Sequence, residues 1–230
     1  VLSFFVVKRE ERGEFVQGAY RSSAAILGIA FIQNIYGTSG MAPLMIIGTV
    51  PLYNAFAVIV LSLLKPGQRK MDKALLQKTL KGIVTNPIIL GIAAGFVWAI
   101  LKIPQPEILQ KTVKNMAVLA TPLGLMAMGA SFEGKKALGK LKPTLIASAL
   151  KLVVLAAIFL PIAVWLGYRE SELVAILVML GSATTVSSFV MARNMGHEGI
   201  LTSSIVMVTT LCSAFTLTGW LFLLKTLGLV

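Results

Sequence analysis

The sequence is poor in the residues that disulfides and metal sites require. Its 230 residues include one cysteine, Cys212, and one histidine, His197. One cysteine excludes an internal disulfide and any metal site built from several cysteines. His197 has no cysteine, aspartate or second histidine nearby, so we expect it to be a solvated turn residue and not a ligand. We therefore expect no metal and no other cofactor.

Charge is scarce as well, and acidic residues are the scarcest. Charged residues make up 13% of the chain and hydrophobic residues 57%, with a mean hydropathy of +0.86. An average soluble domain carries about 25% charged and 45–50% apolar residues. A soluble enzyme, a disordered region and a nucleic-acid-binding domain fit poorly, despite the net charge of +12. None of the nine acidic residues lies inside an apolar run, so proton coupling through carboxylates has no support.

Long apolar stretches dominate what is present. A spanning helix needs about 20 mostly apolar residues. Residues 1–7 read as the end of a helix whose beginning is absent. We therefore predict one all-α integral membrane domain with about seven full transmembrane helices and an N-terminal helix stub. The predicted spans are residues 18–36, 41–64, 83–103, 113–132, 144–168, 173–192 and 200–224.

The basic residues alternate between the two sides of these spans. Of the 21 lysines and arginines, 15 lie on one side, Arg21 among them, and 5 on the other, while Lys151 lies inside a span. Loops rich in lysine and arginine stay in the cytoplasm. We therefore expect a multi-pass protein of the cell membrane, with the basic loops in the cytoplasm against lipid headgroups and the C-terminus outside.

The second half of the chain echoes the first. Gly37 and Gly40 align with Gly196 and Gly199, and each G-x-x-G joins a polar segment to an apolar one on opposite sides of the membrane. Such copies are inverted repeats with an odd number of spans each. We predict five plus five spans in the intact protein, of which this chain lacks the first two and most of the third. Residues 1–64 are then the remainder of the first repeat, 65–82 a basic cytoplasmic linker and 83–230 the second repeat.

Two spans at corresponding places carry small polar residues. Glycine and hydroxyl residues at matching positions of inverted repeats indicate a transporter site, because irregular backbone inside a membrane is tolerated only beside a polar cavity. The alternative is that small residues let helices approach closely, with hydroxyls bonded to their own backbone. The paired occurrence favours a substrate site. Its candidate residues are Ser22, Ser23, Gly28, Gln33 and Asn34 in the first span and Gly181, Ser182, Thr184, Thr185 and Ser187 in the second.

Lys151 is the one further candidate, as a cation well inside a predicted span. A charge at this depth usually faces a cavity or a partner. It either attracts or gates an anion, or it extends its side chain towards the cytoplasmic surface.

The chain resembles the auxin efflux carrier family of membrane transporters, including its bacterial malate-permease-like members. The resemblance rests on QGAYRSSAAILGIAFIQNIYG, VPLYNAFAVIVLSLL, NPIILGIAAG, ATPLGLMAMGASF and SSFVMARNMG. It implies ten spans in two inverted five-helix repeats, with the fourth and ninth helices broken and crossed near the midplane, and elevator-like transport of small organic anions such as carboxylates. Ser23, Ala30 and Ala183 depart from the asparagine and the two prolines usual in the family.

We therefore expect a secondary carrier and not an enzyme. The expected partners are a small organic anion and membrane lipids, with no nucleic acid, and the sequence leaves a homodimer open. One alternative is an intramembrane enzyme, for which no H-E-x-x-H motif is present and only a serine activated by Lys151 remains. A channel and a truncated membrane protein that does not transport are the others.

Overall fold

The computed structural model describes residues 2–38, 40–67, 77, 80–82, 84–85 and 87–230, with the backbone alone for residues 25–28, 30 and 88. These residues form helices and no strand, which confirms the all-α prediction. Most of the predicted linker, residues 65–82, lies outside them. The elements are α1 Ser3–Val6, η1 Arg9–Glu11, α2 Arg12–Tyr20, α3 Ala24–Tyr36, α4 Ala42–Leu63, α6 Pro87–Ile100, α7 Glu107–Ala130, α8 Gly134–Leu138, α9 Leu141–Ala149, the π-helical turn η2 Leu150–Val154, α10 Leu155–Trp165, α11 Glu170–Gly181, α12 Ser187–Asn194 and α13 Ile200–Thr226.

Membrane-spanning length is reached in several of these elements. Within the described part of the chain, four helices are long and apolar enough to cross a membrane, and one apolar helix is shorter. The two remaining predicted spans are the pairs α2–α3 and α11–α12, each of which is interrupted. The long candidates are α4, α7, the continuous α9–η2–α10 and α13, and the shorter helix is Ile89–Ile100 in α6.

Both interruptions are short extended segments. Arg21 follows α2 with φ −67° and ψ 137°, and Ser182 follows α11 with φ −77° and ψ 161°. Serine and threonine hydroxyls compete with the helical hydrogen bonds of the backbone, which favours a break where several of them cluster. The breaks form with alanine, and not proline, at positions 30 and 183.

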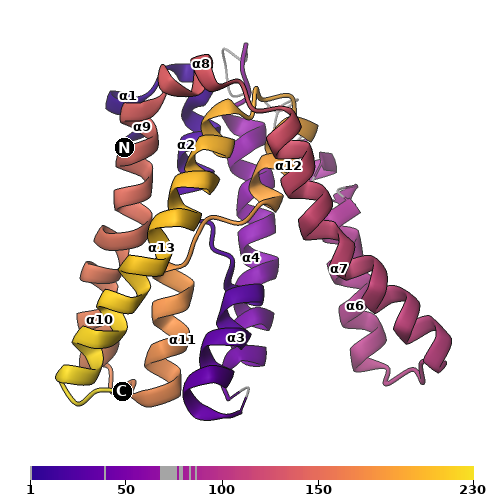
Figure 1. Cartoon of the computed structure of the whole chain (residues 1–230). Helices are drawn as coiled ribbons and strands as arrows, with labels where there is room; N and C mark the ends of the chain where they lie inside the picture. The colour runs from indigo at the N-terminus through magenta and orange to yellow at the C-terminus, as the bar shows by residue number, and fades with distance from the viewer. Residues whose placement is uncertain (1, 39, 68–76, 78–79, 83, 86) are drawn as a thin grey trace.

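The glycines that begin and end the two G-x-x-G motifs all have a positive φ. Gly37 and Gly40 have φ of 70° and 44°, and Gly196 and Gly199 have φ of 85° and 76°. Glycine adopts a positive φ without the steric cost that a side chain brings. Figure 1 shows that α4 and α13, which follow these turns, begin at opposite ends of the molecule. The division of the chain into two inverted repeats stays a prediction.

Helix α13 is the central element of the bundle. It contacts α2, α9, α11 and α12, and Leu201, Ile205 and Leu217 on it are buried. Helices α6 and α7 tilt away from this bundle in Figure 1, and they contact it mainly through α4 and α12. The most apolar window of α7 is 11% buried, compared with 56% in α13, so α7 lies at the periphery.

The basic segments gather at one end of the molecule. In Figure 1, α1, α8 and the start of α13 lie at the upper end, and the C-terminus lies at the lower end. An ion pair between Lys140 and Glu11 ties the segment before α9 to η1 at that upper end. Which end faces the cytoplasm stays a prediction from the distribution of basic residues.

Candidate functional site

The two broken spans touch at their breaks. The backbone N–H of Ser23 donates to the carbonyl of Ala183 at 2.9 Å. The hydroxyl of Thr184 donates to the carbonyl of Gly18, the third-last residue of α2, at 2.8 Å. The hydroxyls of Ser22 and Ser182 are hydrogen-bonded to each other. Residues more than 150 positions apart in the sequence thus hold the two extended segments together.

Three side chains satisfy the last carbonyls of α11. The hydroxyl of Ser22 donates to the carbonyl of Val178 at 3.1 Å. The carbonyl of Met179 accepts from the Tyr53 hydroxyl at 3.1 Å and from Lys151 Nζ at 3.2 Å. Lys151 Nζ also donates to the carbonyl of Leu180 at 2.7 Å. The Val178 carbonyl also accepts from the backbone N–H of Ser182 at 3.2 Å. Helix ends leave their final carbonyls without helical partners, and at Met179 and Leu180 side chains from other elements take that place.

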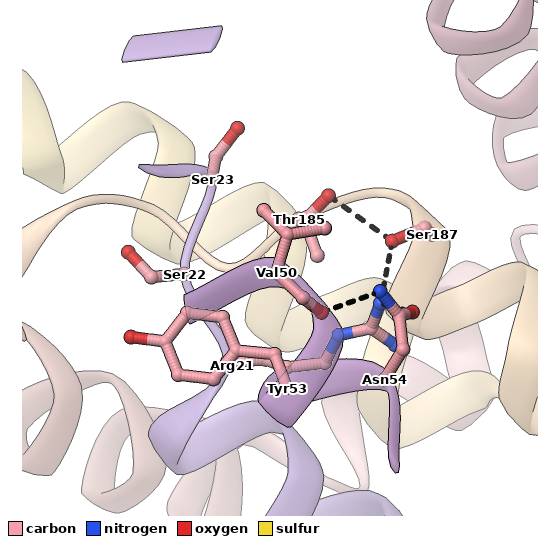
Figure 2. Close-up of a pocket in the computed structure, with 8 residues that line it drawn as sticks. All are labelled: Arg21, Ser22, Ser23, Val50, Tyr53, Asn54, Thr185 and Ser187. Atoms are coloured by element: carbon pink, nitrogen blue, oxygen red, sulfur yellow. Dashed lines mark hydrogen bonds between the residues drawn. The ribbon is translucent and has the colours of Figure 1, made fainter. Parts of the chain in front are cut away.

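Arg21 lies in the first break and is 2% exposed. One terminal nitrogen donates to Asn54 Oδ1 at 2.7 Å and to the Ser187 hydroxyl at 2.9 Å. The other has only long contacts, with Gln17 Oε1 at 3.5 Å and Met191 Sδ at 3.6 Å, and Nε has no partner. Figure 2 shows the guanidinium lying between Asn54 and Ser187.

A cavity of about 170 Å³ opens beside this guanidinium (Figure 2). Pockets for drug-sized ligands measure about 300–1,000 Å³, so this volume suits a smaller molecule. Among its described lining residues, Arg21 is the only one with a formal charge. The lining consists of Arg21, Ser22, Ser23, Val50, Tyr53, Asn54, Thr185 and Ser187.

A larger cavity of about 540 Å³ adjoins the first and shares Ser23, Asn54, Thr185 and Ser187 with it. Its other wall comes from α6 and α7, with Ile92, Ala120, Thr121, Gly124 and Leu125. The polar cavity at the breaks therefore continues into an apolar space between the bundle and the α6–α7 pair.

The electrostatics of this site are one-sided. In the described part of the chain, no carboxylate forms an ion pair with Arg21, and none lines either cavity. A buried ion without a counter-ion loses several kcal/mol of solvation free energy. Pairing with an ion of opposite charge restores a similar amount. An arginine also offers five N–H donors in a planar fork that matches a carboxylate. The site therefore favours an anion chemically.

The structure brings several predicted site residues together and places others elsewhere. Ser22, Ser23, Thr185 and Ser187 line the first cavity, and Thr184 lines the second. Gly181 and Ser182 are buried behind the cavity, where the last turn of α11 packs against Leu217.

The remaining predicted residues lie away from the two cavities. Gln33 and Asn34 are exposed near the C-terminal end of α3, about 15 Å along the helix from the break at 1.5 Å per residue. Gly28 lies within α3, where only the backbone is described. Lys151 is completely buried and points to α11 and not to the cytoplasmic surface.

Sequence reasoning missed Arg21, Tyr53 and Asn54 as site residues. Arg21 was counted with the charges that set orientation, and that interpretation is wrong because its side chain is buried in the break. Asn54 carried a usable signal, since it is an isolated amide within an apolar stretch. The first broken span also begins at Arg12 and not at residue 18, because Glu14 and Gln17 face the protein interior.

Two further polar residues are buried where the turn before α13 meets α2 and α4. Glu14 is 2% exposed and accepts hydrogen bonds from the backbone N–H groups of Gly199 and Thr202 and from the Thr202 hydroxyl, each at 2.9 Å. His197 is 3% exposed and its Nε2 is hydrogen-bonded with the carbonyl of Leu61 at 3.0 Å. The expectation of a solvated His197 is therefore wrong, because the turn before α13 packs against α2 and α4.

Comparison with known proteins agrees with this geometry. The family described as "Membrane transport protein" matches residues 1–221. None of the curated proteins and none of the solved structures matches this chain. The matched family is one of transporters and not of enzymes, so the family match excludes the alternative of an intramembrane enzyme. The chain thus belongs to the membrane transport protein family, which includes the auxin efflux carriers, and is a multi-pass membrane protein of the secondary transporter type.

Proposed function

We propose that this protein is a secondary carrier of small organic anions such as carboxylates, bound where the two broken helices cross. The observation that carries the proposal is Arg21, a buried guanidinium that lines a cavity and has only uncharged hydrogen-bond partners. A carboxylate entering the cavity supplies the missing counter-charge and acceptors for the unused N–H groups.

The rest of the lining suits the same ligand. Ser23, Thr185 and Ser187 place hydroxyl groups around the cavity and can donate to a carboxylate oxygen. Ser23 precedes α3 and Ser187 opens α12, so both half-helices begin at the cavity. The N-terminal end of a helix carries a partial positive charge of about half an elementary unit, which stabilises an anion.

The packing also supports alternating access of the elevator type. The bundle around α13 includes both breaks, whereas α6 and α7 contact it mainly through α4 and α12. The larger cavity lies along this thin contact. In the proposed mechanism the bundle moves against a scaffold that includes α6 and α7 and carries the anion across. The proposal includes the ten-helix arrangement of two inverted repeats, divided at residues 65–82, with the basic end in the cytoplasm.

Uptake by the protein reconstituted in liposomes tests this function. Labelled monocarboxylates and dicarboxylates should enter with saturable kinetics and be stimulated by unlabelled anion on the opposite side, whereas choline and neutral sugars should not enter. Saturation with trans-stimulation distinguishes a carrier from a channel. Uptake of every solute class alike, or linear uptake without saturation, would refute the proposal.

Two substitutions locate the site. Ser23→Leu and Thr185→Leu fill the cavity with apolar atoms and should abolish uptake and anion binding. Thr218→Leu is the matched control, because Thr218 is exposed on α13 and bonds only to its own helix, at the carbonyl of Ala214. Retained anion binding in both cavity variants would place the substrate elsewhere.

A further inference from the structure

We infer that the C-terminal end of α11 is a cation site and that the ammonium group of Lys151 permanently occupies it, in place of a soluble alkali cation. The inference rests on the proposed function only for the coupling of anion transport to a cation, since the cation site itself is defined by hydrogen-bond contacts.

The contacts of Lys151 are those of a coordinated cation. Its Nζ lies 2.7 Å from the carbonyl of Leu180 and 3.2 Å from that of Met179, the two residues before the end of α11. The side chain is 0% exposed. In the described part of the chain no carboxylate forms an ion pair with it. Backbone carbonyls at a helix end are therefore its whole set of partners.

The backbone around Lys151 forms an irregular helical turn that contacts the end of α11. Lys151 lies in the π-helical turn η2, a rare conformation that is frequent at functional sites. The Leu152 carbonyl in the same turn accepts a hydrogen bond from Trp220 Nε1 at 3.1 Å, so the distorted turn is satisfied from α13. That carbonyl also lies 3.8 Å from where a Cβ on Gly181 would stand, so η2 and the end of α11 are in direct contact.

Electrostatics favour a monovalent cation at this place. The C-terminal end of a helix carries a partial negative charge of about half an elementary unit. Unwound carbonyls and half-helix C-terminal ends coordinate the coupling cation in carriers built from broken helices. A lysine that reaches the same carbonyls supplies the same charge without a binding equilibrium.

A direct connection links this position to the substrate cavity. The Met179 carbonyl accepts from both Lys151 Nζ and the Tyr53 hydroxyl, and Tyr53 lines the cavity beside Arg21. In many carriers a bound cation orders the substrate site from a neighbouring position. Here Lys151 holds the last carbonyls of α11 in position. Tyr53 is hydrogen-bonded to one of these carbonyls, so its position in the cavity wall depends on that of α11.

Replacement of Lys151 by residues of different size tests the inference on the purified protein. Lys151→Ala removes the charge and leaves room for a hydrated ion, whereas Lys151→Met removes the charge and fills the room. Thermal unfolding is measured in N-methylglucamine, sodium, lithium and potassium chloride. We expect Lys151→Ala to unfold roughly 5–10 °C below the wild type in N-methylglucamine and to recover in sodium or lithium. The Leu180 carbonyl loses its donor, the Met179 carbonyl keeps only that of Tyr53, and the shorter side chain leaves a cavity.

Controls separate a specific cation from a general salt effect. The wild type and Lys151→Met should respond alike to all four salts, and Lys142→Ser, an exposed lysine of α9, should behave as the wild type. An equal response of Lys151→Ala and Lys151→Met, or a sodium response of the wild type as large as that of Lys151→Ala, would overturn the inference. If Lys151→Ala folds only when purified in sodium, the inference is supported. If it folds in no salt while Lys151→Met folds, the inference fails.

Transport adds an independent measurement. Anion uptake by the wild type should be unchanged when sodium is replaced by N-methylglucamine on both sides, and uptake by Lys151→Ala should need sodium or lithium. If the wild type moves no anion, the proposed function fails and the thermal measurement still decides whether α11 ends in a cation site.

Discussion

Replacing Arg21 by methionine should make the ligand-free protein more stable and inactive at the same time. Most substitutions that abolish function by disrupting a fold lower its stability, so this combination is diagnostic. Methionine has a similar length and no charge, and it leaves the cavity beside Asn54 and Ser187 without its only formal charge.

The magnitude follows from the contacts of Arg21. Removing a buried charge that has no counter-ion relieves a desolvation penalty of several kcal/mol, and replacing buried ionic groups by apolar ones is neutral or stabilising by about 1–4 kcal/mol. Against this, Asn54 Oδ1 loses its 2.7 Å donor, which costs about 1–3 kcal/mol. The Ser187 hydroxyl keeps its contact with the Thr185 hydroxyl at 3.3 Å. We expect the relief of desolvation to be the larger of the two, with a net gain of at most about 3 kcal/mol, the difference between a gain of about 4 and a cost of about 1 kcal/mol.

Thermal unfolding in detergent with and without anion, together with liposome uptake, measures both effects. For a chain of this size 1 kcal/mol shifts the midpoint by about 2–4 °C, so Arg21→Met should unfold at a temperature equal to the wild type or up to about 10 °C higher. Added anion should raise the midpoint of the wild type and not that of the variant. Arg21→Lys keeps the charge and loses the planar fork, so we expect weaker binding with partial uptake.

An exposed arginine provides the control. Arg169→Met removes an exposed charge at the residue before α11, outside both cavities, and uptake should stay intact. A fall of more than about 5 °C in the midpoint of Arg21→Met would show that Arg21 is a structural residue whose contacts outweigh its desolvation. Normal uptake by Arg21→Met would remove it from the substrate site.

Two further predictions concern the start of α13. Glu14→Gln should destabilise the protein by roughly 2–3 kcal/mol, because an amide N–H₂ group replaces an oxygen that accepts charge-assisted hydrogen bonds from Thr202 at 2.9 Å. Unfolding by denaturant or heat measures the loss of stability. A loss no larger than that of Glu10→Gln, at an exposed residue nearby, would contradict this prediction. Gly199→Ala should also lower the midpoint of thermal unfolding, because Gly199 has φ of 76° and a Cβ there would lie 2.7 Å from Cδ of Arg193. Gly48→Ala is the control, since nothing lies within 4 Å of the Cβ that it adds. If Gly199→Ala leaves the midpoint unchanged, the turn accommodates the side chain and the prediction is wrong.

The sequence by itself determined the membrane architecture. Stretches such as residues 41–64 and 200–224 identify spans because hydropathy is a local property that needs no knowledge of neighbours. Clusters of serine, threonine and glycine at residues 22–28 and 181–188 marked the broken spans for the same local reason, and the family motifs lie in these segments. The structure confirms the breaks and brings Ser22, Ser23, Thr185 and Ser187 to one cavity.

Only the tertiary structure decided what the buried charges do. Arg21 contacts Ser187, Glu14 contacts Thr202, and Lys151 contacts Leu180. The first two of these pairs join residues 166 and 188 positions apart. A charged residue near the end of a span has the same local sequence signal whether it meets lipid headgroups or a cavity. Its role is set by the partner that folding brings to it, and that partner lies on another helix.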